Sequence, residues 1–144
     1  NSGIRDCEGF CDFYNYGYAS FFRGSFGVLN SVINPNIIKA ESTPIELFLF
    51  DTATKAYILD AKDLDINPDL LVLSCPGDEL RILPRLPKLP MFIKLALHQH
   101  TRSQIYYNNI LLSWLKKQKY RSFVIERNNF GTYYEILFQK FAYF

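Results

Sequence analysis

The stretch that most constrains the fold is residues 101–131, where a helix start, a helical period, a basic helix end and a chain break follow one another. Thr101 and Gln104 form a capping-box pattern, in which the two side chains satisfy the first free amides of a helix. Apolar residues then recur at helical spacing, with Leu115 at the margin of the stripe: Tyr107, Ile110, Leu111 and Trp114. We therefore expect a helix that begins at residue 101 and packs against a core.

The end of this helix carries four cations: Lys116, Lys117, Lys119 and Arg121. Cations at this position favour the negative end of the helix dipole, so helix termination explains them. The aromatic side chains of Trp114, Tyr120 and Phe123 lie close to them in the sequence. Cations beside aromatic rings also suit nucleic-acid binding, through phosphate contacts and base stacking. Both interpretations stay open, and the four cations are candidate binding residues.

The chain after the helix predicts an interior strand over residues 122–127, against which the helix packs, and a break at residues 128–131. The tail, residues 132–144, fits two structures. As the returning arm of a hairpin it would turn Tyr134, Ile136 and Phe138 inward. Thr132 and Glu135, however, repeat the capping-box pattern of a helix, and we expect a helix there.

The first part of the chain predicts an irregular or partly extended lead-in over residues 1–16 and a core helix over residues 18–33, which Pro35 ends. Residues 45–50 and 55–59 are two β-rich runs around a short polar link, which predict a hairpin.

Residues 70–73 predict a third, fully buried strand, and residues 91–97 fit either a strand or a short helix. Together these elements predict one α+β domain over residues 1–144, in mixed α/β layers. We expect one sheet of about four or five strands packed by two or three helices.

Prolines recur at every third residue at positions 84, 87 and 90, which predicts a polyproline II segment. Arg81, Pro84 and Pro87, with an aliphatic residue before each proline, resemble the arginine-first class of ligands for Src-homology 3 domains. That resemblance implies a docking partner of this type. The plainer interpretation is a stiff connector whose leucines face the core.

Residues 125–131, after the predicted helix, resemble the Glu-containing strand end of the RNase H-like nuclease domain in phage terminase large subunits, and the resemblance implies a second helix after this segment. The resemblance implies that Glu126 is a metal ligand and that Asp51, at the end of a candidate strand, is its partner. Two carboxylates can share Mg²⁺ for phosphodiester hydrolysis. The plainer interpretation is a strand followed by an Asn-Gly turn.

Cysteine and histidine offer one further candidate site. Cys7, Cys11, His98 and His100 would supply four zinc ligands if the fold brought them together, and otherwise they are ordinary half-buried cysteines and surface histidines. An odd number of cysteines, three, does not match a disulfide framework and favours an intracellular, reducing compartment.

Charge and composition favour an interaction domain over an enzyme. Residues 1–90 carry 8 Lys/Arg and 12 Asp/Glu, whereas residues 91–144 carry 8 Lys/Arg and only 2 Asp/Glu. Aromatic residues, 17% of the chain, suit sticky interfaces. The chain has no phosphate-binding loop, nucleophile elbow or His-Glu-x-x-His motif. We expect a non-catalytic assembly domain without a cofactor or membrane span, whose partners are proteins and, in one version, nucleic acid.

Overall fold

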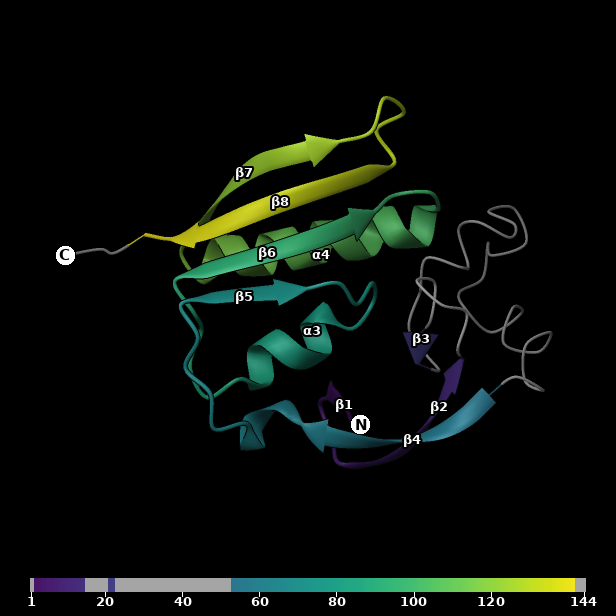
Figure 1. Ribbon diagram of the computed structural model, residues 1–144. Helices are drawn as coiled ribbons and strands as arrows, with labels where there is room; N and C mark the ends of the chain where they lie inside the picture. The colour runs from purple at the N-terminus through teal and green to yellow at the C-terminus, as the bar shows by residue number, and fades with distance from the viewer. Residues whose placement is uncertain (1, 15–20, 23–52, 142–144) are drawn as a thin grey trace. The chain divides into compact units, whose positions relative to one another are not determined.

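The computed structural model describes residues 2–14, 21–22 and 53–141 (Figure 1). The chain divides into two compact units, one of Asn1–Asp65 with Cys75–Pro87 and one of Ile66–Ser74 with Lys88–Phe144. Each unit contains a four-stranded sheet, and helices accompany both, so the predicted α+β class is confirmed. The sequence predicted one sheet, and the described ranges hold two. A single domain over residues 1–144 stays a prediction, because one domain can contain two such units.

The first unit is built around β4 (Ala53–Asp60), whose predicted strand character at residues 55–59 is confirmed. β1 (Ser2–Arg5) pairs parallel with β4 on one side, and β2 (Gly9–Tyr14) pairs antiparallel with it on the other. β3 (Phe21–Phe22) continues the sheet beyond β2. The other predicted arm of the hairpin, residues 45–50, lies outside the described residues.

The start of the chain is more regular than predicted. The lead-in predicted as irregular or partly extended, residues 1–16, contains the paired strands β1 and β2, because pairing with β4 supplies the backbone hydrogen bonds that a lone segment lacks. Of the helix predicted over residues 18–33, only Phe21 and Phe22 are described, and they form a strand. Aromatic residues suit strands as well as helix faces, so a dense aromatic run does not distinguish the two.

Only the start of the segment predicted as polyproline II is helical: Pro84 and Arg85 belong to a 3-10 helix, whereas residues 86–90 belong to no helix or strand. α3 (Glu79–Ile82) runs into a 3-10 helix, η5 (Leu83–Arg85), and a second 3-10 turn, η4 (Ala61–Asp63), follows β4. Pro84 lies in the first turn of η5, where the missing N–H of proline leaves no hydrogen bond unmade. Leu83 is fully buried, in agreement with a connector whose leucines face the core.

The second unit contains a sheet in the order β5-β6-β8-β7, with one helix on one face (Figure 1). β5 (Leu70–Leu73) pairs parallel with β6 (Phe92–His98), and β6 pairs antiparallel with β8 (Tyr133–Lys140). β8 pairs antiparallel with β7 (Tyr120–Arg127). Helix α4 (Arg102–Lys117) lies against the face that carries the buried strand residues: Ile93, Leu95, Leu97, Ile136 and Phe138.

The start of α4 is as predicted, but its buried face is rotated. The capping box of Thr101 and Gln104 is present, with 3.2 Å from the Gln104 amide N to Thr101 Oγ1. The buried residues are Gln104, Asn108, Leu111 and Leu115, whereas Ile110 is 44% exposed. Asn108 Nδ2 donates to the His98 carbonyl at 3.0 Å. The predicted face was found from the spacing of apolar residues alone. Gln104 and Asn108 are polar residues that are buried because they cap the helix or bridge to a carbonyl, so the prediction left them out.

The tail is a strand, so the helix predicted over residues 132–144 is wrong within the described part, which reaches residue 141. Asn128 holds a tight turn: its Oδ1 accepts from the Thr132 amide at 2.9 Å, and its Nδ2 donates to Thr132 Oγ1 at 2.7 Å. The Thr132 hydroxyl that a capping box needs is therefore engaged in the turn. The hairpin alternative holds, with Ile136 and Phe138 buried.

The other strands correct two further expectations. β5 has the predicted bounds, but Leu70 and Val72 are 49% and 58% exposed, so this strand lies half-exposed at a sheet edge. The strand predicted over residues 122–127 lies within β7. It was expected in the interior of the fold, yet β8 takes the inner position and β7 the edge. Residues 91–97, which fitted strand or helix, belong to β6 apart from Met91.

Candidate interaction surface

The free edge of β7 is the most exposed regular element of the second unit. Within the described ranges β7 pairs with β8 alone, so its outer edge presents unpaired backbone N–H and C=O groups. Every residue of β7 after Tyr120 is exposed. Phe123, Val124 and Ile125 form an uninterrupted apolar centre with exposed fractions of 46%, 58% and 54%. This centre is what a strand added to the edge would cover.

A β-bulge sets which side chains share a face of β7. The register shifts between Val124 and Glu126, so Ile125 is the extra residue. Arg121, Phe123 and Glu126 then lie opposite alternate residues of β8, namely Gln139, Leu137 and Glu135. Because alternate residues of a strand share a face, these three side chains lie on the face of the sheet away from α4.

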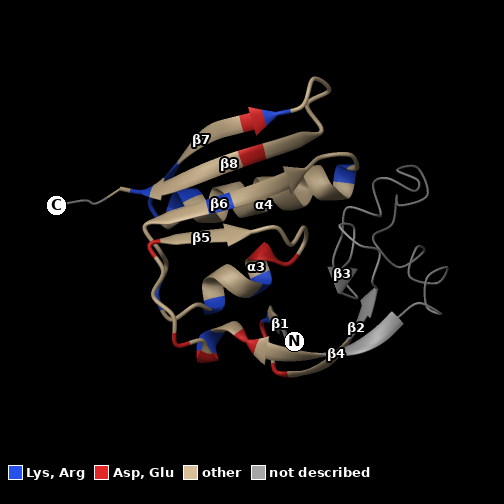
Figure 2. Cartoon of the chain, in the orientation of Figure 1, with Lys and Arg blue, Asp and Glu red and all other residues tan. Residues whose placement is uncertain are grey.

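The four predicted binding cations follow one another along the connection from α4 to β7, as the blue segments of Figure 2 show. Lys116 and Lys117 occupy the last turn of α4, and all four are exposed: Lys116, Lys117, Lys119 and Arg121. Lys119 has a left-handed backbone with φ of 70°. Arg121 Nη2 donates to Gln139 Oε1 at 3.1 Å, and its guanidinium carbon lies 5.5 Å from the centre of the Phe123 ring.

A buried tyrosine anchors the start of this strand. Tyr120 is 4% exposed, and its hydroxyl donates to the Pro90 carbonyl. Burial raises the pKa of Tyr120 to about 12, so the hydroxyl stays protonated and keeps donating at neutral pH. The cations of the connection are therefore held at a fixed point of the second unit.

The outer face of α4 carries a shallow groove of about 440 Å³. Its lining combines two aromatic rings, one isoleucine and polar side chains: Tyr106, Asn109, Ile110, Ser113, Trp114 and Lys117. Lys117 belongs both to this groove and to the four cations. Trp114 is half-buried and lines the same groove as Lys117.

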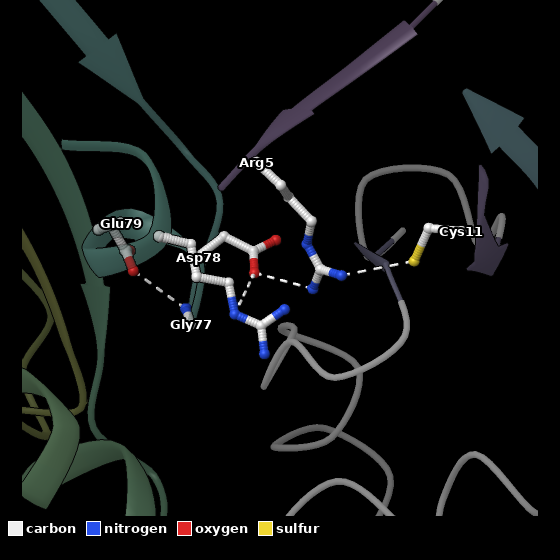
Figure 3. A network of polar contacts seen from close by, with 6 residues as sticks. Arg5, Cys11, Gly77, Asp78 and Glu79 are labelled. Atoms are coloured by element: carbon white, nitrogen blue, oxygen red, sulfur yellow. Dashed lines mark hydrogen bonds and ion pairs between the residues drawn. The ribbon is translucent and has the colours of Figure 1, made fainter. Parts of the chain in front are cut away.

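The first unit holds a buried polar network (Figure 3). Arg5 Nη2 donates to Asp78 Oδ1 at 2.9 Å, and Arg5 Nη1 lies 3.4 Å from Cys11 Sγ. Glu79, 1% exposed, accepts from the Gly77 amide at 3.0 Å. Burial, together with the charges of Glu79 and Asp78, raises the pKa of Cys75. A protonated thiol is a poor nucleophile, so this network suits a structural role.

The predicted docking motif is placed in an unsuitable conformation. Arg81 belongs to α3, and its Nε lies 3.9 Å from Asp78 Oδ1. Pro84 and Pro87 are exposed, but Pro84 is part of η5. Src-homology 3 domains take extended polyproline ligands, so binding in that mode would require α3 and η5 to unfold.

For the nuclease alternative, the described residues supply no second metal-binding carboxylate to act with Glu126. Asp51 lies outside the described residues, and Glu126 is an exposed residue of an edge strand opposite Glu135. The element that follows is strand β8, where the resemblance implied a helix. In the described ranges no three His, Cys, Asp or Glu side chains group as metal ligands. A metal site of Asp51 and Glu126 stays a prediction.

The four zinc candidates, all of which are described, do not group as metal ligands either. Cys7 is exposed and Cys11 is half-buried beside Arg5. His98 stacks with His100 at a ring separation of 6.1 Å and contacts the ring of Tyr133 at 5.1 Å. The plainer interpretation, half-buried cysteines and surface histidines, holds for Cys11 and His100, whereas Cys7 is exposed and His98 is half-buried.

The apolar centre of β7 was missed as a functional candidate in the sequence, although a signal for it exists. Residues 123–125 are three successive aromatic or β-branched residues flanked by Arg121 and Glu126, a composition typical of strands that pair with other chains. Its exposure depends on β8 taking the inner position, which the sequence did not indicate.

No protein-family model, curated protein or solved structure matches this chain. No helix within the described residues has both the length and the apolar content to cross a membrane.

Proposed function

We propose that this chain is a non-catalytic interaction domain of a larger assembly, and that it docks a partner by strand addition to β7. The observation that carries the proposal is the exposed apolar centre on an eight-residue edge strand. Added strands gain main-chain hydrogen bonds along such an edge, while side chains on both faces provide specificity.

Comparison of the two edges of this sheet supports the choice of β7. Edge strands are normally blunted by short length, proline or charge. β5 has four residues and follows Pro68 closely. β7 is twice as long, contains no proline and carries charges only toward its two ends. An edge of this kind is either covered by a partner or prone to aggregate.

Site-specific crosslinking tests this proposal. A photoreactive benzoylphenylalanine in place of Ile125 should form covalent adducts in the cells that make this chain. The same residue in place of Val72, which is 58% exposed on the opposite edge strand, should form few. Val124→Lys, which places a charge in the apolar centre, should abolish the adducts at position 125. Equal yields at positions 72 and 125, or none at either, would contradict docking at β7.

A second candidate function, nucleic-acid binding, is favoured by the exposed cations that continue from the Trp114 groove to β7. Phosphate contacts by Lys and Arg bind without sequence preference and weaken as salt rises. Lys116→Glu/Lys117→Glu should elute from immobilised single-stranded DNA at clearly lower salt than the wild type. Lys62→Glu/Lys88→Glu, with the same change in net charge, should elute close to the wild type if the cluster is the site.

A further inference from the structure

We infer that the partner docked on β7 is a second copy of this chain, paired antiparallel with the first about a two-fold axis at Phe123. The inference rests on the proposed function, because it names the partner for the same edge. A two-fold interface uses one patch on both subunits, so that patch must complement itself. The side chains of β7 meet this condition.

On the face away from α4, the bulge makes Arg121, Phe123 and Glu126 evenly spaced, since they oppose Gln139, Leu137 and Glu135 of β8. A two-fold axis at Phe123 reverses this order in the second copy. Arg121 of each copy then lies opposite Glu126 of the other, and the two Phe123 rings meet at the axis. Opposite charges and aromatic pairs directly across two strands both stabilise the pairing.

The face toward α4 is compatible with the same axis. Tyr120, Ser122, Val124 and Arg127 oppose four alternate residues of β8: Lys140, Phe138, Ile136 and Tyr134. Reversal about the axis places Ser122 opposite Val124 and Tyr120 opposite Arg127. No like charges meet on either face in this register.

Other registers of self-pairing are less favourable. An axis at Arg121 would oppose the two copies of Arg121, and an axis at Glu126 would oppose the two carboxylates. An axis at Ser122 leaves Glu126 beyond the paired region. An axis at Val124 opposes no like charges, but it places Glu126 opposite Phe123 and forms no opposite-charge pair within β7. The register centred on Phe123 is the one that pairs Arg121 with Glu126, and the charges of β7 therefore favour it.

Exchange of the two charges tests this register. Arg121→Glu alone makes two carboxylates meet at both ends of the interface, and Glu126→Arg alone makes two guanidinium groups meet. Each single variant should dimerise at least about tenfold more weakly than the wild type. An equimolar mixture of the two variants restores both opposite-charge pairs. It should therefore form a heterodimer with near wild-type affinity in sedimentation velocity.

Recovery in the mixture also shows that both variants are folded. Should either fail to fold, Val124→Lys and Val72→Lys provide a second test, because these valines have the same 58% exposure on opposite edges. Only Val124→Lys should weaken dimerisation.

A wild-type chain that stays monomeric from micromolar to millimolar concentration overturns the self-pairing, and so does a dimer insensitive to both charge changes. The mass of the crosslinked adduct at position 125 distinguishes failure of the self-pairing from failure of partner docking at β7. A monomeric chain that crosslinks to another protein overturns the proposal that the partner is a second copy, but it supports docking at β7. Adducts of two chains support the second copy.

Discussion

At the scale of residues, the first unit depends on paired charges, of which Arg5, Asp78 and Asp60 are buried and Arg85 is half-exposed. Arg5 joins Asp78 across 73 positions of the chain, and Arg85 joins Asp60 across 25. Arg85 Nη2 lies 2.7 Å from Asp60 Oδ2, and Arg85 Nε lies 3.2 Å from Asp60 Oδ1, a two-point contact. A buried charge without its partner costs far more than an exposed one, so these pairs fix which segments lie together.

The pair of Arg5 and Asp78 provides a stability prediction. Asp78→Ala removes the carboxylate that the Arg5 guanidinium, 7% exposed, contacts at 2.9 Å. We expect the free energy of unfolding to fall by about 3 kcal/mol, measured by urea denaturation. Asp65→Ala, at an exposed loop position, should change it by no more than about 0.5 kcal/mol. Equal effects at the two positions would argue against the buried pair.

The pair of Arg85 and Asp60 predicts a pH dependence. The hydrogen bond from Arg85, aided by the Lys62 amide, lowers the pKa of the Asp60 carboxyl. Because the folded pKa lies below the unfolded value of about 3.9, the stabilisation is complete above that value. It is lost as the pH falls through the folded pKa. The urea midpoint should therefore decline below about pH 4.

Arg85→Met should make this acid decline of the urea midpoint shallower, because the unfolded and folded pKa values of Asp60 then approach each other. Lys88→Met, which removes an exposed cation nearby in sequence, is the matched control and should keep the wild-type decline. An Arg85→Met variant with the full wild-type decline would show that other carboxylates cause it.

At the scale of elements, two capping-box patterns in one chain have different outcomes. Thr101 and Gln104 start α4, whereas Thr132 and Glu135 belong to a turn and a strand. The difference lies in their neighbours. Asn128 engages both the amide and the hydroxyl of Thr132, and the strand residues that follow pair with β6 and β7. Local sequence pattern predicted α4 and most of β7. It could not show that the turn at Asn128 and the pairing of β8 with two strands are more stable than a helix capped by Thr132.

The end of α4 predicts opposite effects for one substitution at two nearby positions. Lys119 has a φ of 70°, a conformation that costs an L-residue energy and that glycine adopts freely. Lys119→Gly should therefore stabilise the protein by about 0.5 kcal/mol. Lys117→Gly, in the last turn of the helix, should destabilise it by about 1 kcal/mol. Thermal unfolding of the two variants measures both, and destabilisation by Lys119→Gly would contradict the strain.

At the scale of the whole molecule, charge divides between the two units. The unit of residues 66–74 and 88–144 carries nine Lys and Arg against three Asp and Glu. The other unit carries seven against eleven. The asymmetry recognised along the sequence therefore follows the compact units. An anionic partner would select the basic unit, which also contains β7 and the four cations.

The three free cysteines give a reporter for opening of the first unit. Cys7 is exposed, and Cys75 is half-buried with a raised pKa. In the native protein at pH 8, iodoacetamide should modify Cys7 at least about tenfold faster than Cys75, as followed by mass spectrometry. With added urea, Cys75 labelling should rise as the first unit unfolds. Equal rates without urea would contradict the burial of Cys75.

Features that depend on neighbours a few positions apart could be predicted from the order of residues: the capped start of α4, the strands at residues 55–59, 70–73 and 122–127, and the charge asymmetry. These follow from local hydrogen bonds, side-chain shape and composition. The inner position of β8, the edge position of β7 and the burial of Gln104 and Asn108 became evident in the folded chain. Those outcomes depend on which distant segments pair, and a periodic pattern does not carry that information.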